Sequence, residues 1–376
     1  MTYTPEFFIK DFAKALHEQA AAAFVGAGLS QGAGYPGWES LVTDLAHRLN
    51  LPSTKDLPAL AQFAVNRDRG RSLVNKRIVE EFTRPRALTD AHRELVKLPL
   101  RTFWTTNYDT LIETALTQFK GLPEVKKSQE DLARHIPDRT ATVFKMHGDA
   151  ESPQEAVLVR DDYEDYARTK ELFIDVFTAD LLMKTFVFVG VSFSDPNLMF
   201  LLGRLRSIFD GARKEHFWIA KQPELGSSEA DLFALRIEDL QRYGIRTVVL
   251  DSHAQLAPLL AKVHREYLTM RRRNSVFLSG SVRDANPRAQ EIRDFAKQIA
   301  EKLVLNGRTI ITGLGRGIGT WVTTAALEAL YKTSEYEVRS DKVIARPFPV
   351  GSATDPAARR THRVRMISEA GFSIFI

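Results

Sequence analysis

The sequence predicts an α/β protein with a doubly wound, mostly parallel sheet, followed by a second and smaller α/β domain. Apolar runs of strand length alternate along the chain with segments of helical periodicity, which is the pattern of strands joined by helical crossovers. Several apolar runs end in glycine or in polar residues just before a helix begins, as parallel strands do at the edge where ligands bind. At 376 residues, the chain is long enough to bury two cores.

The elements of the first domain follow in order along the chain. An amphipathic helix over Pro5–Gln19 precedes a first strand over 21–25. A helical insertion separates this strand from the next, with helices at Gly37–Asn50, Leu57–Asn66 and Arg71–Phe82. Later strands are expected at 101–105, 142–146, 185–189, 216–220 and 246–250. Helices are expected to alternate with them at Asp195–Phe209, Ser228–Tyr243 and Gln255–Leu268.

A short, highly charged segment, Arg271–Asn274, precedes a new apolar strand over 276–278. We place the domain boundary there, with a first domain over 1–270 and a second over 275–376. A long helix and a strand over 309–312 follow, which makes the second domain Rossmann-like.

Polar and glycine-rich strings follow three strands of the first domain. Gly26 and Gly28 come directly after the first strand, where they allow backbone amides to approach a phosphate group. The alternative is that these glycines serve only a tight turn between strand and helix. Asn107 and His147 follow the strands over 101–105 and 142–146. Because the carboxyl ends of parallel strands share one edge, we expect these groups to form one ligand site.

The strings Gly26-Ala27-Gly28-Leu29-Ser30, Thr105-Thr106-Asn107-Tyr108-Asp109 and His147-Gly148 resemble, in this order, the pattern of the sirtuin superfamily. Gly190-Val191-Ser192-Phe193 matches a fourth, serine-bearing loop of that family. The resemblance implies an NAD site that includes Gly26, Ala27, Gly28, Ser30, Asp109, Gly190 and Ser192. Two departures bear on function. The chain has no Cys for the zinc module of protein deacylases, and Gly37-Trp38-Glu39 replaces an Asp-Phe-Arg string that contacts the cofactor.

Cleavage of the nicotinamide–ribose bond needs a held leaving group, a positioned water and a base for the proton of that water. We expect Asn107 to orient ribose hydroxyls or the water, and His147 to act as the base. Asp109 either steadies the nicotinamide end or the Asn107 loop, or it caps a helix. We expect Ser192 to contact the nucleotide, while Ser194 and Asp195 are available to cap the next helix.

The second domain carries a second glycine-rich edge, Ser279-Gly280-Ser281 and Gly313-Leu314-Gly315. These glycines either bind phosphate or serve close packing of helix on strand. Together with the string 342–349, the region resembles the SLOG group of nucleotide-sensing domains. The expected ligand contacts are Ser279, Gly280, Ser281, Gly313, Gly315 and Arg346.

A sirtuin-like domain followed by a SLOG domain resembles the NAD-hydrolysing effectors of the Thoeris anti-phage system. The resemblance implies cleavage of NAD⁺ to nicotinamide and ADP-ribose, and thereby abortive infection through NAD depletion. It also implies activation by a cyclic ADP-ribose isomer from a TIR-domain partner enzyme, and assembly into homotetramers or higher oligomers. The family's sensor domain continues beyond the strand-like run 371–375, so we expect this domain to be truncated.

Two other function classes stay open: an NAD-dependent protein deacylase or ADP-ribosyltransferase, and a non-catalytic nucleotide sensor. The absent zinc module argues against the first, and the presence of Asn107 and His147 argues against the second.

The composition of the chain bears on its cofactors, its localisation and its partners. The absence of Cys excludes disulfides and thiolate metal sites, and no other metal-ligand cluster is apparent, so we expect no metal. The resemblance implies that NAD⁺ is the substrate and that there is no bound cofactor. No signal peptide or membrane span is visible, which favours the bacterial cytoplasm. The net charge of +5 arises wholly within 275–376, where 15 Lys and Arg face 10 Asp and Glu. An anionic ligand fits this excess, whereas the lack of interleaved aromatics or DNA-binding motifs argues against nucleic acid.

Overall fold

A computed structural model describes residues 3–52, 54–208, 214–282, 285–314, 317–333, 340–347 and 355–376. The chain divides into two compact units, residues 1–266 and 267–376. No helix in the described ranges is both long and apolar enough to cross a membrane.

Seven parallel strands form the sheet of the first unit, in the order β3-β4-β2-β1-β5-β6-β7. From β1 the chain builds one half of the sheet through β2, and it then returns to the other side of β1 with β5. The order therefore reverses at β1 and β5, and ligands bind at such switch points in doubly wound sheets. The strands are β1 (Ala21–Val25), β2 (Thr102–Thr105), β3 (Pro123–Lys126), β4 (Ala141–Lys145), β5 (Thr185–Val189), β6 (His216–Lys221) and β7 (Ile245–Leu250).

Helices cover both faces of this sheet, and the predicted fold class is confirmed. Every residue of β1 and β2 is buried, as expected for central parallel strands. The helices of the first unit are α1 (Pro5–His17), α2 (Ala27–Gln31), α3 (Trp38–Arg48), α4 (Leu57–Asp68), α5 (Ser72–Phe82), α6 (Asp90–Lys97), α7 (Leu111–Phe119), α8 (Gln129–Leu132), α9 (Arg160–Glu164), α10 (Tyr166–Thr169), α11 (Glu171–Met183), α12 (Pro196–Ile208), α13 (Ser228–Gln241) and α14 (Leu256–Arg273). Single 3-10 turns occur at Pro153–Glu155, His253–Gln255 and Ser340–Lys342.

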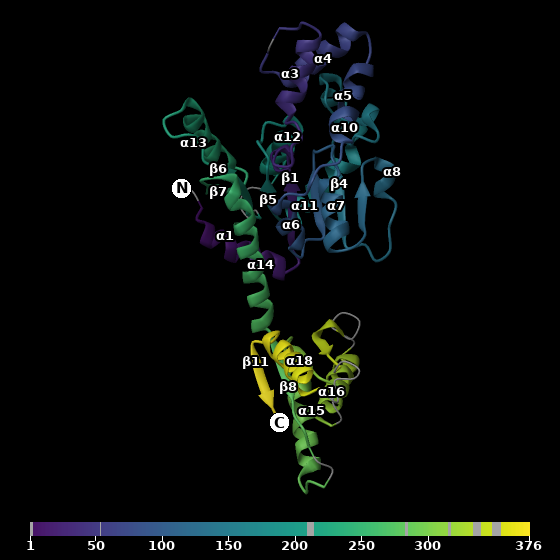
Figure 1. The fold of residues 1–376 in the computed structure, drawn as a ribbon, viewed down its shortest axis with the longest axis vertical. Helices are drawn as coiled ribbons and strands as arrows, with labels where there is room; N and C mark the ends of the chain where they lie inside the picture. The colour runs from purple at the N-terminus through teal and green to yellow at the C-terminus, as the bar shows by residue number, and fades with distance from the viewer. Residues whose placement is uncertain are drawn as a thin grey trace. The chain divides into compact units, whose positions relative to one another are not determined.

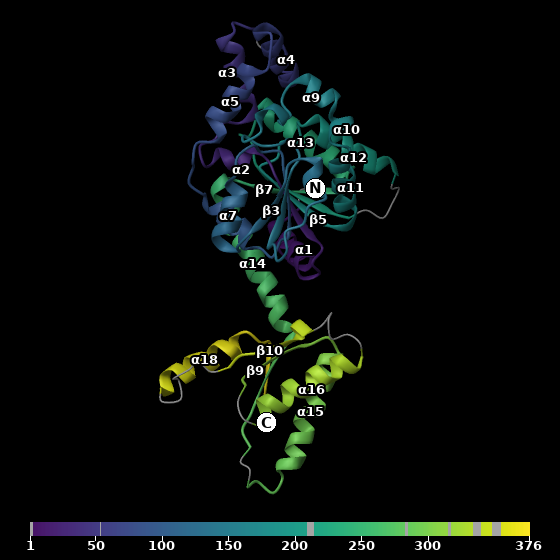
Figure 2. The ribbon, with the colours of Figure 1, turned by 90° about the vertical axis from the view of Figure 1, so that its right-hand side faces the viewer.

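The helical insertion is present as α3, α4 and α5, which gather at one end of the first unit (Figures 1 and 2). Their apolar faces share one core with Tyr108 and with the segment 150–159, which follows the His147 turn. Arg71, directly before α5, makes two hydrogen bonds of 2.8 and 2.9 Å to the carboxylate of Asp162. The insertion is thereby fixed beside the carboxyl ends of β2 and β4.

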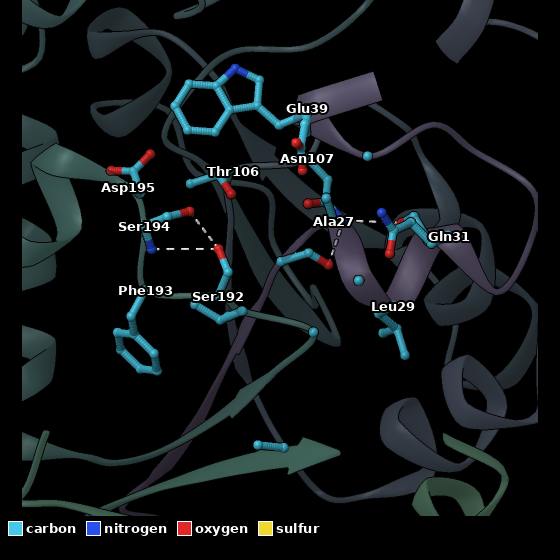
Figure 3. A pocket seen from close by; sticks show the side chains of 18 of the residues that line it. Ala27, Leu29, Gln31, Glu39, Thr106, Asn107, Ser192, Phe193, Ser194 and Asp195 are labelled. Atoms are coloured by element: carbon cyan, nitrogen blue, oxygen red, sulfur yellow. Dashed lines mark hydrogen bonds between the residues drawn. The ribbon is translucent and has the colours of Figure 1, made fainter. Parts of the chain in front are cut away.

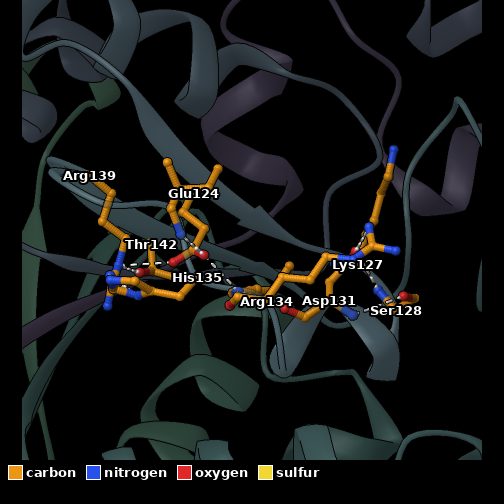
Figure 4. A network of polar contacts seen from close by, with 10 residues as sticks. Glu124, Lys127, Ser128, Asp131, Arg134, His135, Arg139 and Thr142 are labelled. Carbon is orange, nitrogen blue, oxygen red and sulfur yellow. Dashed lines mark hydrogen bonds and ion pairs between the residues drawn. The ribbon is translucent and has the colours of Figure 1, made fainter.

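The edge strand β3 has no counterpart in our predictions, because it carries charged side chains that are nonetheless buried. Lys126 Nζ lies 2.8 Å from Glu124 Oε1, and Arg139 Nε lies 2.9 Å from Glu124 Oε2 (Figure 4). The amide of Ile136 donates to the same carboxylate at 2.9 Å. Burial opposes the ionisation of Glu124, but the hydrogen bonds from Lys126 and Ile136, together with the charges of Lys126 and Arg139, lower its pKa.

The second unit has four parallel strands in the order β10-β9-β8-β11. The strand expected at 371–375 is β11, which pairs with β8. In both views α15 and α16 lie side by side (Figures 1 and 2). The elements are β8 (Ser275–Ser279), α15 (Ala289–Leu305), β9 (Thr309–Thr312), α16 (Ile318–Lys332), β10 (Val343–Ala345), α18 (Pro356–Ser368) and β11 (Phe372–Phe375).

The charged segment that we interpreted as a joint is helical up to Arg273, because α14 continues through it. Three arginines in the last turn of a helix interact favourably with its dipole and so extend it. The division between the two compact units falls within α14, between Glu266 and Tyr267.

Candidate functional site

A cavity of about 1100 Å³ lies at the carboxyl ends of the central strands of the first unit. The structure brings together there all the site residues that the sequence predicted for this domain. Figure 3 shows Ser192, Ser194 and Asp195 on one side of the cavity, with Asn107 and Gln31 on the other. The predicted residues that line it are Gly26, Ala27, Gly28, Ser30, Asn107, Asp109, His147, Gly190 and Ser192.

The glycine loops after β1 and β5 are in close contact and are joined by backbone hydrogen bonds. Gly26 N donates to Val189 O and Gly28 N donates to Gly190 O, both at 2.9 Å. A Cβ on Gly26 would lie 2.4 Å from Gly190 O, and a Cβ on Gly190 would lie 2.3 Å from Leu29 N. The amides of Gly26 and Gly28 are therefore engaged within the fold, and these two glycines allow a close contact between the two loops.

Asn107 is held in one orientation. Its side-chain Nδ2 donates to Gly26 O at 3.2 Å and to Ser30 Oγ at 3.0 Å. Its backbone N donates to Thr105 Oγ1 at 2.9 Å, and this hydroxyl donates to Val25 O at 2.8 Å. The remaining carbonyl oxygen, Oδ1, is buried without a hydrogen-bond partner in the described chain. The network therefore leaves an acceptor in the cavity for a ligand donor.

Asp109 uses one of its two carboxylate oxygens within the fold. Its Oδ1 accepts from the amide of Leu111, the first residue of α7, at 3.0 Å. Its Oδ2 is buried and unpartnered among the described residues, and the residue lines the cavity. One oxygen is thus used by the fold and the other remains available.

A buried lysine that the sequence analysis missed supports this strand end. Lys145, the last residue of β4, is fully buried. Its Nζ donates to Asp109 O at 2.7 Å and lies 3.1 Å from Glu113 Oε1. Burial raises the pKa of Glu113, and the charge of Lys145 opposes that effect. Lys145 therefore joins β4 to the loop that carries Asn107.

His147 follows β4 at a turn in which Gly148 has a φ of +73°. The imidazole is only 4% exposed and makes edge-to-face contacts with Tyr163 and Tyr166, with ring centroids 5.8 and 5.9 Å away. Its Nε2 lies 3.4 Å from Asp195 Oδ2. Burial lowers the pKa of His147 below its ordinary value, although the Asp195 carboxylate raises it. The ring is consequently neutral at neutral pH, as a general base requires.

The loop after β5 supplies further polar groups. The hydroxyls of Ser192 and Ser194 share a hydrogen bond of 2.6 Å, and Arg236 donates to Ser192 O at 3.1 Å. Asp195 Oδ1 accepts from Leu198 N at 2.9 Å, so Asp195 takes the helix-capping role that the sequence left open.

Aromatic residues from outside the predicted strings also line the cavity. Trp38 belongs to the string that departs from the sirtuin pattern, and its ring centroid lies 6.1 Å from that of Tyr163. Trp218, on β6, donates from Nε1 to Val191 O at 2.9 Å. Neither tryptophan carried a sequence signal for a site, because large apolar side chains are usually core residues.

In the second unit, the predicted ligand residues follow neighbouring strands. Ser279, Gly280 and Ser281 come at the end of β8, Gly313 follows β9 and Arg346 follows β10. A Cβ on Gly280 would lie 2.0 Å from Ile376 O, so this glycine at least has a packing role. The guanidinium of Arg346 donates to Glu369 Oε2 at 3.2 Å. Gly315 lies outside the described residues.

Comparison with known families assigns both parts of the chain. Residues 101–248 match the SIR2-like domain family, and residues 255–376 match the Sir2- and TIR-associating SLOG family. The chain is 38% identical to the NAD(+) hydrolase ThsA of Bacillus cereus strain MSX-D12, over 99% of this chain and 79% of that protein. It is 34% identical to NAD(+) hydrolase ThsA of Cytobacillus dafuensis (100% of this chain, 79% of that protein). It is also 34% identical to the Enterococcus faecium protein of the same name (98% and 80%).

Proposed function

Because the chain belongs to the family of the NAD(+) hydrolases ThsA, it is an NAD(+) hydrolase, and we propose that NAD⁺ binds in the cavity at the switch point. The main support is a pair of buried oxygen atoms around this cavity that have no partner in the described chain: Asn107 Oδ1 and Asp109 Oδ2. Burying such atoms costs free energy unless a ligand completes their hydrogen bonds. The volume of about 1100 Å³ suits a ligand as large as a dinucleotide.

In the proposed reaction, water adds to C1′ of the nicotinamide-bearing ribose. The C–N bond breaks, and nicotinamide leaves with its electron pair. Asn107 Oδ1 accepts a hydrogen bond from a ribose hydroxyl or from the attacking water, and His147 takes the proton of that water. The products are nicotinamide, ADP-ribose and a proton. Positioning of water and sugar supplies most of the remaining rate enhancement.

Incubation of the protein with NAD⁺ and no acceptor tests this function. Release of free ADP-ribose in step with nicotinamide is the expected result. NAD⁺ consumption that occurs only with an acylated or acceptor protein would show a deacylase or ADP-ribosyltransferase instead. Tight binding of NAD⁺ with no turnover under any effector would show a non-catalytic sensor.

For the second unit we propose a regulatory role. A cyclic ADP-ribose isomer, made by a TIR-domain partner enzyme, binds at the carboxyl edge of β8, β9 and β10 and activates NAD⁺ cleavage. The match to a Sir2- and TIR-associating SLOG family and the basic excess of 275–376 support this role. In this proposal the enzyme is a homo-oligomer of the bacterial cytoplasm that depletes NAD⁺ during phage infection.

Arg346→Ala is expected to shift the activation curve to higher effector concentration by about 10-fold or more, since a charge-assisted hydrogen bond contributes about 1.5–3 kcal/mol. Raising an active state from about 1% to about 99% takes roughly 5.5 kcal/mol of differential binding, so several contacts must act together. The measurement is NAD⁺ hydrolysis against each cyclic ADP-ribose isomer. Arg365→Ala is the control, because Arg365 also pairs with Glu369 but lies on α18. Coincident curves for the Arg346 variant and wild type would remove Arg346 from the binding site.

Activity is expected to be unchanged in EDTA. The chain has no Cys, and no group of three His, Asp or Glu in the described ranges could hold a metal ion. The proposed chemistry relies on His147 as the base and needs no Lewis acid. Initial rates before and after dialysis against chelator check this, and a loss that zinc restores would reveal a metal site.

A further inference from the structure

Asp195 faces the imidazole of His147 from the other side of the switch point. It precedes Pro196, the first residue of α12, and its Oδ1 caps that helix through Leu198 N at 2.9 Å. Its second oxygen, Oδ2, lies 3.4 Å from His147 Nε2. One side chain therefore joins the end of β5 to the residue that follows β4.

Building on the function above, we propose that Asp195 is a positioning residue that orients His147 and strengthens it as a base. Nε2 is buried without a hydrogen-bond partner in the described chain, and the nearest anionic oxygen to it is Asp195 Oδ2. A short closure of the 3.4 Å gap lets Nε2 donate to the carboxylate. This fixes the tautomer in which Nδ1 carries the free lone pair, and Nδ1 then accepts the proton from water.

The other charged groups near the ring are engaged elsewhere. Lys170 Nζ donates to Lys127 O at 3.1 Å, and the Asp162 carboxylate is held by Arg71. Tyr163 and Tyr166 present ring contacts and keep their protons, because burial raises the pKa of both phenols. Among these neighbours, Asp195 alone brings an anionic oxygen within 4 Å of an imidazole nitrogen.

The carboxylate also compensates for burial of the imidazole. Burial lowers the pKa of His147, Asp195 raises it, and Lys170 lowers it further. Without Asp195 the ring would be a weaker base and would accept the proton from water less readily. With Asp195, the imidazolium formed during the reaction is stabilised by a fixed negative charge.

Asp195→Asn separates this role from capping, because Asn caps helices as well as Asp does. We expect kcat to fall by about 10²-fold and the acid limb of the kcat/KM profile to move to lower pH. Asp355→Asn is the matched control. Asp355 caps α18 through Ala357 N and Ala358 N and also precedes a proline, and α12 and α18 each have 13 residues. Its rate and profile should match wild type, and both variants should keep the wild-type unfolding midpoint.

An Asp195→Asn enzyme with the wild-type acid limb would overturn the proposal, whether or not its rate falls. If that variant does not fold, Asp195→Ser, which also keeps a capping oxygen, is subject to the same criterion. The result for His147→Ala separates this inference from the proposed function. If the enzyme lacking the imidazole still hydrolyses NAD⁺ normally, His147 is not the base and the mechanism itself fails. If it is inactive while Asp195→Asn behaves as wild type, only the role of Asp195 fails.

Discussion

His147→Ala should lower NAD⁺ turnover by about 10²–10⁴-fold, a barrier increase of roughly 3–5 kcal/mol, because the reaction loses its base. Its Nε2 has no hydrogen-bond partner within the described chain and the residue borders the cavity, so folding should change little. Nicotinamide release at saturating NAD⁺ gives the rate, and thermal unfolding checks the fold. Since burial lowers the pKa of His147 from its ordinary value, the acid limb of the wild-type kcat/KM profile should lie at lower pH than the titration of a free imidazole.

Asn107→Ala should cause a loss of the same order, because it removes both the cavity acceptor Oδ1 and the donor to Ser30. His17→Ala, at an exposed position near the end of α1, is the control and should behave as wild type. Near-normal cleavage by either folded site variant would show that its side chain has no part in the chemistry.

Gly190→Ala should destabilise the first unit by about 2–5 kcal/mol, combining a left-handed backbone penalty of about 1–2 kcal/mol with a steric clash of about 1–3 kcal/mol. Gly190 has a φ of +66°, and its added Cβ would lie 2.3 Å from Leu29 N, a backbone atom. The free energy of unfolding in denaturant is the measurement.

Gly226→Ala separates the two contributions. Gly226 also has a positive φ, +80°, but a Cβ there would meet nothing within 4 Å. Its loss should therefore be limited to about 1–2 kcal/mol. Equal losses for the two variants would mean that the close approach of the loops contributes nothing to stability.

The central strands, and the clustering of the site residues at one edge of the sheet, could be predicted from the sequence. β1 is apolar along its whole length, and β5 is apolar after its first residue, because both faces of these strands are covered, so their limits are visible in the sequence. Asn107 and His147 each come shortly after a mostly buried strand, and parallel topology then brings them to one edge. β3 was invisible because its charged residues are neutralised by partners up to 15 positions away, as in the Glu124–Arg139 pair.

Lys145 and Asp195, which support the site residues, could not be predicted from the sequence because their contacts form only in the folded chain. Lys145 lies in the last position of an apolar strand, and its contact with Asp109 exists only once β2 and β4 pair. Asp195 was visible only as a helix cap, since the contact with His147 depends on two loops that are 48 positions apart in the chain. Arg271–Arg273 suggested a linker by composition, yet a helix that has already formed extends at low cost through good helix formers.

The interlocked glycine loops also limit how the first unit can move. The amides of Gly26 and Gly28 are hydrogen-bonded to the carbonyls of residues 189 and 190, and a Cβ on Gly26 or Gly28 would collide with the backbone of Gly190. The two loops are therefore expected to move only as one body. The floor of the cavity is consequently a stiff platform, and mobility is left to its walls. Those walls include the start of α3, with Trp38 and Glu39, and the loop from Ser192 to Asp195. If the cavity opens and closes around a substrate, we expect these wall segments to move while the two glycine loops of the floor keep their positions.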